Sequence, residues 1–159
     1  MSIKTSIQSQ YNAALMMLKA AVEKCPEELW VDTDYVNPFW HVAYHVLFYT
    51  HFYLSQTDQD FTPWEKHRDE ITSLEPSVKE VQSYNKEDII EYLEYCLVQV
   101  ETQVSTMDLE AESGFYWLPF NKLELQLYNI RHIQQHTGEL CERLGAHGEI
   151  EVGWVGMKG

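Results

Sequence analysis

The segment from residue 37 to residue 55 constrains the fold of this chain more than any other part. It reads NPFWHVAYHVLFYTHFYLS and would place aromatic side chains on nearly every side of a helix. Asn37 followed by Pro38 is typical of a helix N-cap and first turn. A helix that is apolar all round is stable in water only when other elements surround it, so we expect this helix at the centre of the molecule.

Three further segments show helical periodicity, and no useful strand pattern appears before the C-terminal tail. Pro26 prevents the first helix from continuing, and Asn85 with Asp88 forms a helix-starting pattern before the third. Gly145 is a candidate left-handed cap for the last helix. The chain is therefore predicted to be all-α, with the further helices at residues 3–24, 85–106 and 121–145.

Two long links separate the predicted helices, at residues 56–84 and 107–120. The first is polar and contains Pro63 and Pro76, with a short helix expected around residues 64–71. Four helices with two long links predict a four-helix bundle with long crossover connections, in a single domain over residues 1–159. The glycine-rich tail after residue 145 is predicted to be irregular, with Trp154 anchoring it to the bundle.

Composition narrows the classes of partner. The chain has 11 lysines and arginines against 25 acidic residues, a net charge of −14, which argues against nucleic acid or an anionic membrane as a partner. No segment approaches the roughly 20 apolar residues of a membrane span. Cys25, Cys96 and Cys141 form no CxxC pair and fit free thiols in a reducing compartment. We therefore expect a soluble, cytoplasmic protein.

Two of the predicted helices each carry a pair of histidines four residues apart, His41 with His45 and His132 with His136. Residues with this spacing point the same way on a helix, so imidazoles from neighbouring helices can converge on one metal ion. A core histidine satisfied by hydrogen bonds is the alternative for any one of them. Two such pairs on separate helices favour a metal site.

The sequence around these pairs excludes two familiar metal sites. A zinc protease helix has the pattern HExxH, whereas Ile133, Gln134 and Gln135 separate the second pair. A di-iron site of the ferritin type needs a glutamate three residues before a histidine on two helices, and no histidine here has one. What remains is a mononuclear site dominated by neutral imidazole, suited to Zn, Ni or Fe, with an open position if three histidines bind.

The stretches NPFWHVAYHVLFYTHFYL and NIRHIQQHTGEL resemble the second and fourth helices of DinB and YfiT-like proteins. These are four-helix bundles in which three histidines hold a divalent metal. The resemblance covers the whole chain and is weakest in the two links. It implies His45, His132 and His136 as metal ligands, with Zn or Ni as the expected ion and Fe or Mn as other candidates. His41 has no clear counterpart, and it is left as a pocket wall, a group that orients a ligand, or a fourth ligand.

The resemblance also implies an activity. Characterised members of the family are thiol-dependent transferases and isomerases, and others are described loosely as metal-dependent hydrolases. The implied function is a small-thiol-dependent S-transferase, or a hydrolase, acting on a small electrophile, with a homodimer as the family-like expectation. The alternative is a non-catalytic, stress-related metal-binding or scaffold protein, with a structural metal and the aromatic helix as its dimer interface.

Several neighbours of the histidine pairs are further candidates. Asn129 is either substrate-facing, supportive of a ligand, or a surface amide, and Glu139 either orients an imidazole, binds the metal, or is solvated. Arg131 either holds an anionic thiol or carboxylate through a bidentate contact or is merely exposed. Tyr44 and Tyr49 are expected to pack, with one hydroxyl possible at the pocket. No role is assigned to His51, His67 and His147.

Overall fold

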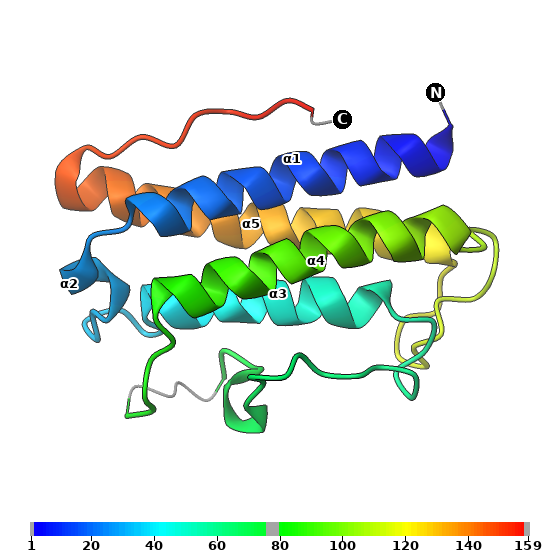
Figure 1. Cartoon of the computed structure of the whole chain (residues 1–159), viewed down its shortest axis with the longest axis horizontal. Coiled ribbons are helices and arrows are strands. Elements are labelled where there is room, and N and C mark those ends of the chain that lie inside the picture. The colour runs from blue at the N-terminus through cyan, green and yellow to red at the C-terminus, as the bar shows by residue number, and fades with distance from the viewer. Residues whose placement is uncertain (1, 76–79, 158–159) are drawn as a thin grey trace.

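Long helices dominate the computed structural model, which describes residues 2–75 and 80–157 (Figure 1). The four long helices are α1 (Ile3–Lys24), α3 (Phe39–Leu54), α4 (Lys86–Thr106) and α5 (Lys122–Gly148). The one-turn helix α2 (Glu27–Trp30) precedes α3, and the 3₁₀ turn η1 (Asp69–Ile71) lies between α3 and α4. These elements confirm the predicted all-α bundle. Among the described residues, no helix combines the length and apolar character that crossing a bilayer requires.

The four long helices pack with α1 diagonally opposite α3. Both α1 and α3 pack against α4 and against α5. In Figure 1, α1 and α5 run in one direction while α3 and α4 run in the other. Because α3 and α4 are parallel, their connection must return along the whole bundle, as the predicted crossover requires. The link between α4 and α5 stays at one end, so the prediction of a second lengthwise crossover is wrong.

One of the two predicted helix caps is confirmed, at Asn85, and the last helix starts where predicted, after Asn121. The side chain of Asn85 accepts a hydrogen bond from the Asp88 N–H, and that of Asn121 accepts one from the Glu124 N–H. The prediction for Asn37 is wrong, because Pro38 is the N-cap of α3 and no side chain caps this helix. Asn37 instead contributes its backbone carbonyl, which accepts a hydrogen bond from Arg143 on α5.

The C-terminal end of α5 also differs from the prediction. Gly145 is helical, and the helix continues to Gly148 before Glu149 adopts the left-handed conformation with a φ of 57°. The N–H groups of Glu149 and Ile150 bond to the carbonyls of Gly145 and Leu144. These bonds pair two carbonyls near the end of the helix, so the cap forms without a glycine at the left-handed position.

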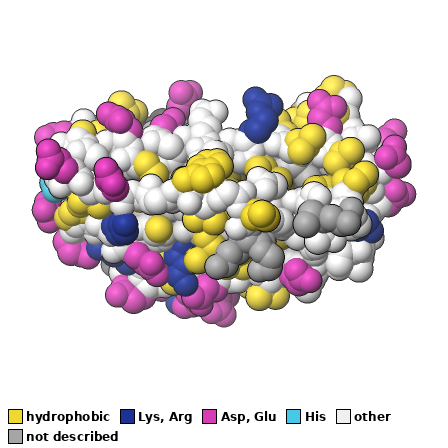
Figure 2. Space-filling view, turned by 90° about the horizontal axis from the view of Figure 1, so that it is seen from above, with side chains coloured by type: hydrophobic (Ala, Val, Ile, Leu, Met, Phe, Trp, Pro, Cys, Tyr) yellow, Lys and Arg dark blue, Asp and Glu magenta, His cyan; other side chains and the backbone are white. Residues whose placement is uncertain are grey.

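The tail folds back along α1 (Figure 1). Lys24 donates to the carbonyl of Glu151 and Gln10 donates to the carbonyl of Gly156. Trp154 is 76% exposed, so its predicted role as the anchor is wrong. The aliphatic side chains of Ile150 and Val152 pack against the core instead. Figure 2 shows this side of the molecule, where hydrophobic side chains lie between mostly acidic ones.

Helix α3 lies at the centre of the core, as its composition predicts. All of its residues except Tyr49 and Phe52 are buried. Helices α4 and α5 cover two of its sides, and residues of the crossover link cover a third through contacts such as Phe61 on Phe48. Most of the surface that this helix would offer as the suggested dimer interface is thus buried within the chain, apart from Tyr49 and Phe52.

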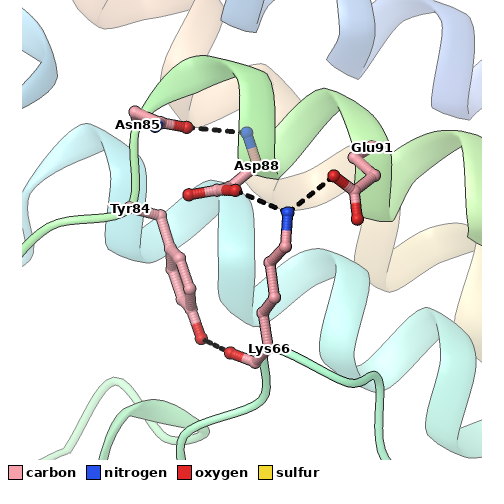
Figure 3. Close-up of polar contacts among 5 residues, drawn as sticks. All are labelled: Lys66, Tyr84, Asn85, Asp88 and Glu91. Atoms are coloured by element: carbon pink, nitrogen blue, oxygen red, sulfur yellow. Dashed lines mark hydrogen bonds and ion pairs between the residues drawn. The ribbon is translucent and has the colours of Figure 1, made fainter.

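The crossover link is fastened to the start of α4 (Figure 3). The Lys66 ammonium lies 2.9 Å from Asp88 Oδ1 and 2.6 Å from Glu91 Oε2, and the Tyr84 hydroxyl donates to the Lys66 carbonyl. The short helix predicted for residues 64–71 is reduced to η1. Pro76, predicted to interrupt this link, lies outside the described residues. These contacts hold the link against the bundle and bring Thr72 next to α3.

The two links meet at the other end of the bundle. The buried ammonium of Lys122 donates to the carbonyls of Gln56, at 2.7 Å, and Ser113, at 2.9 Å. Burial lowers the pKa of Lys122. Gly114 has a φ of +88°, and a Cβ placed there would lie 2.0 Å from the Gln56 carbonyl oxygen. Only glycine fits between the links at this point.

We expect Gly114→Ala to lower the free energy of unfolding by roughly 2 kcal/mol or more, because it adds both backbone strain and a clash with backbone atoms. Gly138→Ala is the matched control, since a Cβ at this helical position meets no atom within 4 Å. It should raise stability by about 0.5–1 kcal/mol through helix propensity. Urea unfolding of both variants is the measurement, and equal stabilities would contradict the packing of the two links.

Because of His51, we expect the free energy of unfolding to depend on pH. Burial lowers the pKa of His51 to about 4, and its ring lies among aromatic side chains with Nδ1 3.1 Å from the Tyr92 hydroxyl. The unfolded chain takes up this proton near pH 6.5 whereas the folded chain does not, so stability falls as the pH drops below 6.5. Protonation of this histidine in the unfolded chain should lower the free energy of unfolding by about 2 kcal/mol between pH 7 and pH 5.

The measurement is urea unfolding at both pH values, with His51→Phe as the comparison. The variant lacks the titrating group, so it should lose less stability than the wild type over this range. An equal loss in both proteins would show that His51 is protonated as readily in the folded chain as in the unfolded one.

Candidate metal centre

The packing of α3 against α5 brings together one histidine from the first pair and both from the second. His45, His132 and His136 each offer a ring nitrogen, and these three nitrogens lie within 4.8 Å of one another. The ring centroid of His45 lies 5.0 Å from that of His132 and 5.0 Å from that of His136. The centroids of His132 and His136 are 4.7 Å apart. Three imidazoles this close form a donor set that could hold one metal ion.

Hydrogen bonds orient two of these imidazoles. His45 donates from Nδ1 to the carbonyl of Thr72 at 2.8 Å, and His136 donates from Nδ1 to the carboxylate of Glu139 at 2.8 Å. A proton fixed on Nδ1 leaves Nε2 with its lone pair available. The partners thus select the tautomer that a metal ligand needs, as carbonyl and carboxylate groups commonly do behind metal-bound histidines.

The short contact between the rings of His45 and His132 is compatible with a bound cation. Their Nε2 atoms lie 3.1 Å apart, and His45 already carries its proton on Nδ1. Two nitrogen lone pairs repel at this distance unless one nitrogen carries a proton or a cation lies near both. His132 Nδ1 is buried without a hydrogen-bond partner among the described residues. The donors are therefore compatible with a divalent ion that prefers nitrogen ligands.

Burial keeps the rings of His45 and His132 neutral. It lowers the pKa of His45 to about 3, against the opposing effect of the Thr72 carbonyl, and the two neighbouring imidazoles lower it further. Burial also lowers the pKa of His132 to about 4, assisted by the nearby His136. Only the neutral imidazole binds a metal, so near pH 7 no proton has to leave His45 or His132 before binding.

His41 has a different role from the three clustered histidines. It is fully buried and donates from Nε2 to the carbonyl of Ile71 at 2.9 Å. The next carbonyl along the link, that of Thr72, accepts from His45. His41 does not join the cluster within the part of the chain that the structure describes. Its ring anchors the same link that orients His45, which favours the orienting role over that of a fourth ligand.

The contacts of the other candidate residues distinguish between the roles predicted for them. Asn129 is fully buried and donates to the carbonyl of Thr50, so neither the surface position nor the substrate-facing one is correct. Glu139 orients His136, as one of its three interpretations predicts. The Tyr49 ring lies 4.9 Å from that of His45 and 5.7 Å from that of His132, and so forms a wall of the cluster.

Sequence reasoning missed two groups of the crossover link that bond to or beside α3. His67, to which no role was assigned, accepts a hydrogen bond from the Tyr44 hydroxyl, and its Nε2 lies 2.9 Å from Asp69 Oδ1. This turns Tyr44 toward the link. The other missed group is the Thr72 carbonyl. Every residue has a backbone carbonyl, so no residue type in the link could have indicated this position.

A surface pocket of about 430 Å³ lies along α5 and reaches one member of the cluster, His132. Its lining consists of Tyr128, Arg131, His132, Gln134 and Gln135. A larger pocket of about 710 Å³ is formed by the link before α5 and contains none of the histidines. His132 is thus the member of the cluster that faces a pocket open to solvent.

The fold and the histidine cluster together define a four-helix-bundle protein with a candidate mononuclear metal centre. The sequence matches the family model of the DinB superfamily over residues 10–140, a range that includes the whole cluster. The chain belongs to the DinB superfamily. No curated protein and no solved structure matches it significantly.

We expect Glu139→Ala to weaken metal binding by about 10- to 100-fold, because the His136 ring loses the carboxylate that fixes its proton on Nδ1. Glu142→Ala is the control, since it removes the same charge from an exposed position on the same helix. Competition with a chromophoric chelator measures both affinities, and circular dichroism checks that the helices are intact. If both variants bind as tightly as the wild type, Glu139 does not support a metal ligand.

Proposed function

We propose that this protein is a mononuclear divalent-metal enzyme that transfers a small thiol to a small electrophile. His45, His132 and His136 would hold the ion, with Zn or Ni as the proposed metal and Fe or Mn as alternatives. The observation that carries the proposal is the convergence of three imidazole nitrogens beside a pocket, with two of the rings already oriented by Thr72 and Glu139.

A bound divalent ion would supply Lewis-acid stabilisation of a thiolate near pH 7. The chain's own residues prepare the site for this chemistry. The Thr72 carbonyl and the Glu139 carboxylate hold protons on the outer ring nitrogens, and the Tyr49 ring excludes water from one side. Three protein ligands leave a coordination position for the thiol, whose sulfur would bond to the electrophilic carbon as the leaving group departs with its electron pair.

The cysteines of the chain support an external thiol. Burial raises the pKa of Cys25, Cys96 and Cys141, which disfavours the reactive thiolate in each. All three are free, which fits the reducing, cytoplasmic location that forms part of this proposal. With no activated cysteine among them, a nucleophilic sulfur must come from a small molecule. A hydrolase would use the same open position for water, with the same ligands.

The scaffold alternative has less support from the structure. It needs a closed metal site and an exposed aromatic helix, but α3 is buried and the Nε2 of His41 is bonded to the link. The first observation argues against α3 as an exposed interface, and the second favours an open, three-ligand centre over one closed by His41.

Metal content by mass spectrometry tests the proposal. We expect about one divalent ion per chain in the wild type, and its loss in His132→Ala, which removes a ligand without disturbing a hydrogen bond to the link. His41→Ala should keep the ion with weaker affinity. Absence of metal from the wild type, together with no uptake of added Zn or Ni, would overturn the metal centre.

The thiol step needs a second measurement. Protein loaded with Co should develop a sulfur-to-metal charge-transfer band when a small thiol is added. A loaded sample that shows no band with any thiol would overturn the transferase assignment while leaving the metal centre intact.

A further inference from the structure

Arg131 is a cation that has no partner among the described residues of this strongly acidic protein. The chain has 25 acidic and 11 basic residues, and acidic side chains outnumber basic ones on the face seen in Figure 2. Lys79 and Lys158 lie outside the described residues. Each of the other lysines and arginines that the structure describes donates to a carboxylate or a backbone carbonyl. Within the described residues, Arg131 alone has no hydrogen bond or ion pair.

The helix around Arg131 explains why it is unpaired. Ion pairs within a helix join residues three or four positions apart. The residues at these positions are Leu127, Tyr128, Gln134 and Gln135, none of which is acidic. The guanidinium therefore keeps all of its donors free for a ligand from solution.

Arg131 also lies beside the candidate metal centre. It precedes His132 and lines the same pocket, whose other lining residues are the phenol of Tyr128 and the amides of Gln134 and Gln135. No carboxylate lines this pocket. A negatively charged ligand would thus meet one free cation and several neutral polar groups, although the surrounding protein surface repels anions.

We propose that Arg131 binds the carboxylate of the small thiol that reaches the metal. This inference rests on the proposed function and specifies its substrate class as small organic thiols that bear a carboxylate. The guanidinium is planar and matches a carboxylate through two parallel hydrogen bonds, which a lysine cannot reproduce. Arg131 is a binding and specificity residue in this proposal, and it takes no part in bond making.

The experiment compares mercaptoacetate with 2-mercaptoethanol on Co-loaded protein. The two thiols differ in the carboxylate, and the charge-transfer band gives a dissociation constant for each. We expect the wild type to bind mercaptoacetate about tenfold more tightly than 2-mercaptoethanol, as a charge-assisted bidentate contact allows. Arg131→Gln should lose this preference while its affinity for 2-mercaptoethanol is unchanged, and Arg131→Lys should retain only part of the preference.

Lys4→Gln is the matched control, because it removes one positive charge from a partly buried residue at the start of α1, outside the pocket. It should keep the wild-type preference, which separates a local contact from a change in net charge. Equal affinities of the wild type for both thiols, or an unchanged preference in Arg131→Gln, would overturn the role of Arg131 while the metal centre stands. If the wild type does not bind Co, or shows no band with either thiol, the proposed function fails and this inference falls with it.

Discussion

The need to bury α3 on every side determines the rest of this structure. A helix with so many aromatic side chains leaves no face for water, so two neighbouring helices are not enough to cover it. The crossover link supplies the remaining cover, and for this reason α3 and α4 can run parallel with a long segment between them. The fastening of Lys66 to α4 and the ring contacts of Phe61 are parts of the same requirement.

Covering α3 with a link instead of a helix changes the chemistry available beside it. A helix bonds nearly all of its own carbonyls, whereas an irregular segment presents carbonyls that need donors. Those of Ile71 and Thr72 find their donors in the imidazoles of His41 and His45. The same bonds satisfy buried polar groups on both partners and fix the proton of each ring. A packing requirement and the orientation of a candidate ligand are thus met by one pair of contacts.

Much of this arrangement could be predicted from the sequence because it depends on periodic patterns. The aromatic run places α3 at the centre, Asn85 and Asn121 mark helix starts, and the histidine spacing indicates a metal centre between two helices. The resemblance to the family, and not the spacing, distinguishes His45 from His41. The errors fall where tertiary contacts decide the outcome. Pro38 replaced Asn37 as a cap, Gly145 stayed helical because paired bonds form at Glu149, and Trp154 is exposed because Ile150 and Val152 carry the packing. The role of the Thr72 carbonyl could not be predicted, because residue types give no information about a backbone group.

The two oriented imidazoles depend on supports of different kinds. His136 is held by a side chain, so a single substitution at Glu139 removes its support. His45 is held by a main-chain carbonyl, which every residue at position 72 would provide. Substitutions at position 72 should therefore leave His45 oriented, whereas an insertion or deletion in the link before it would move the carbonyl away. During evolution, the support of His136 is thus sensitive to substitution, whereas the support of His45 is sensitive to changes in the length of the link.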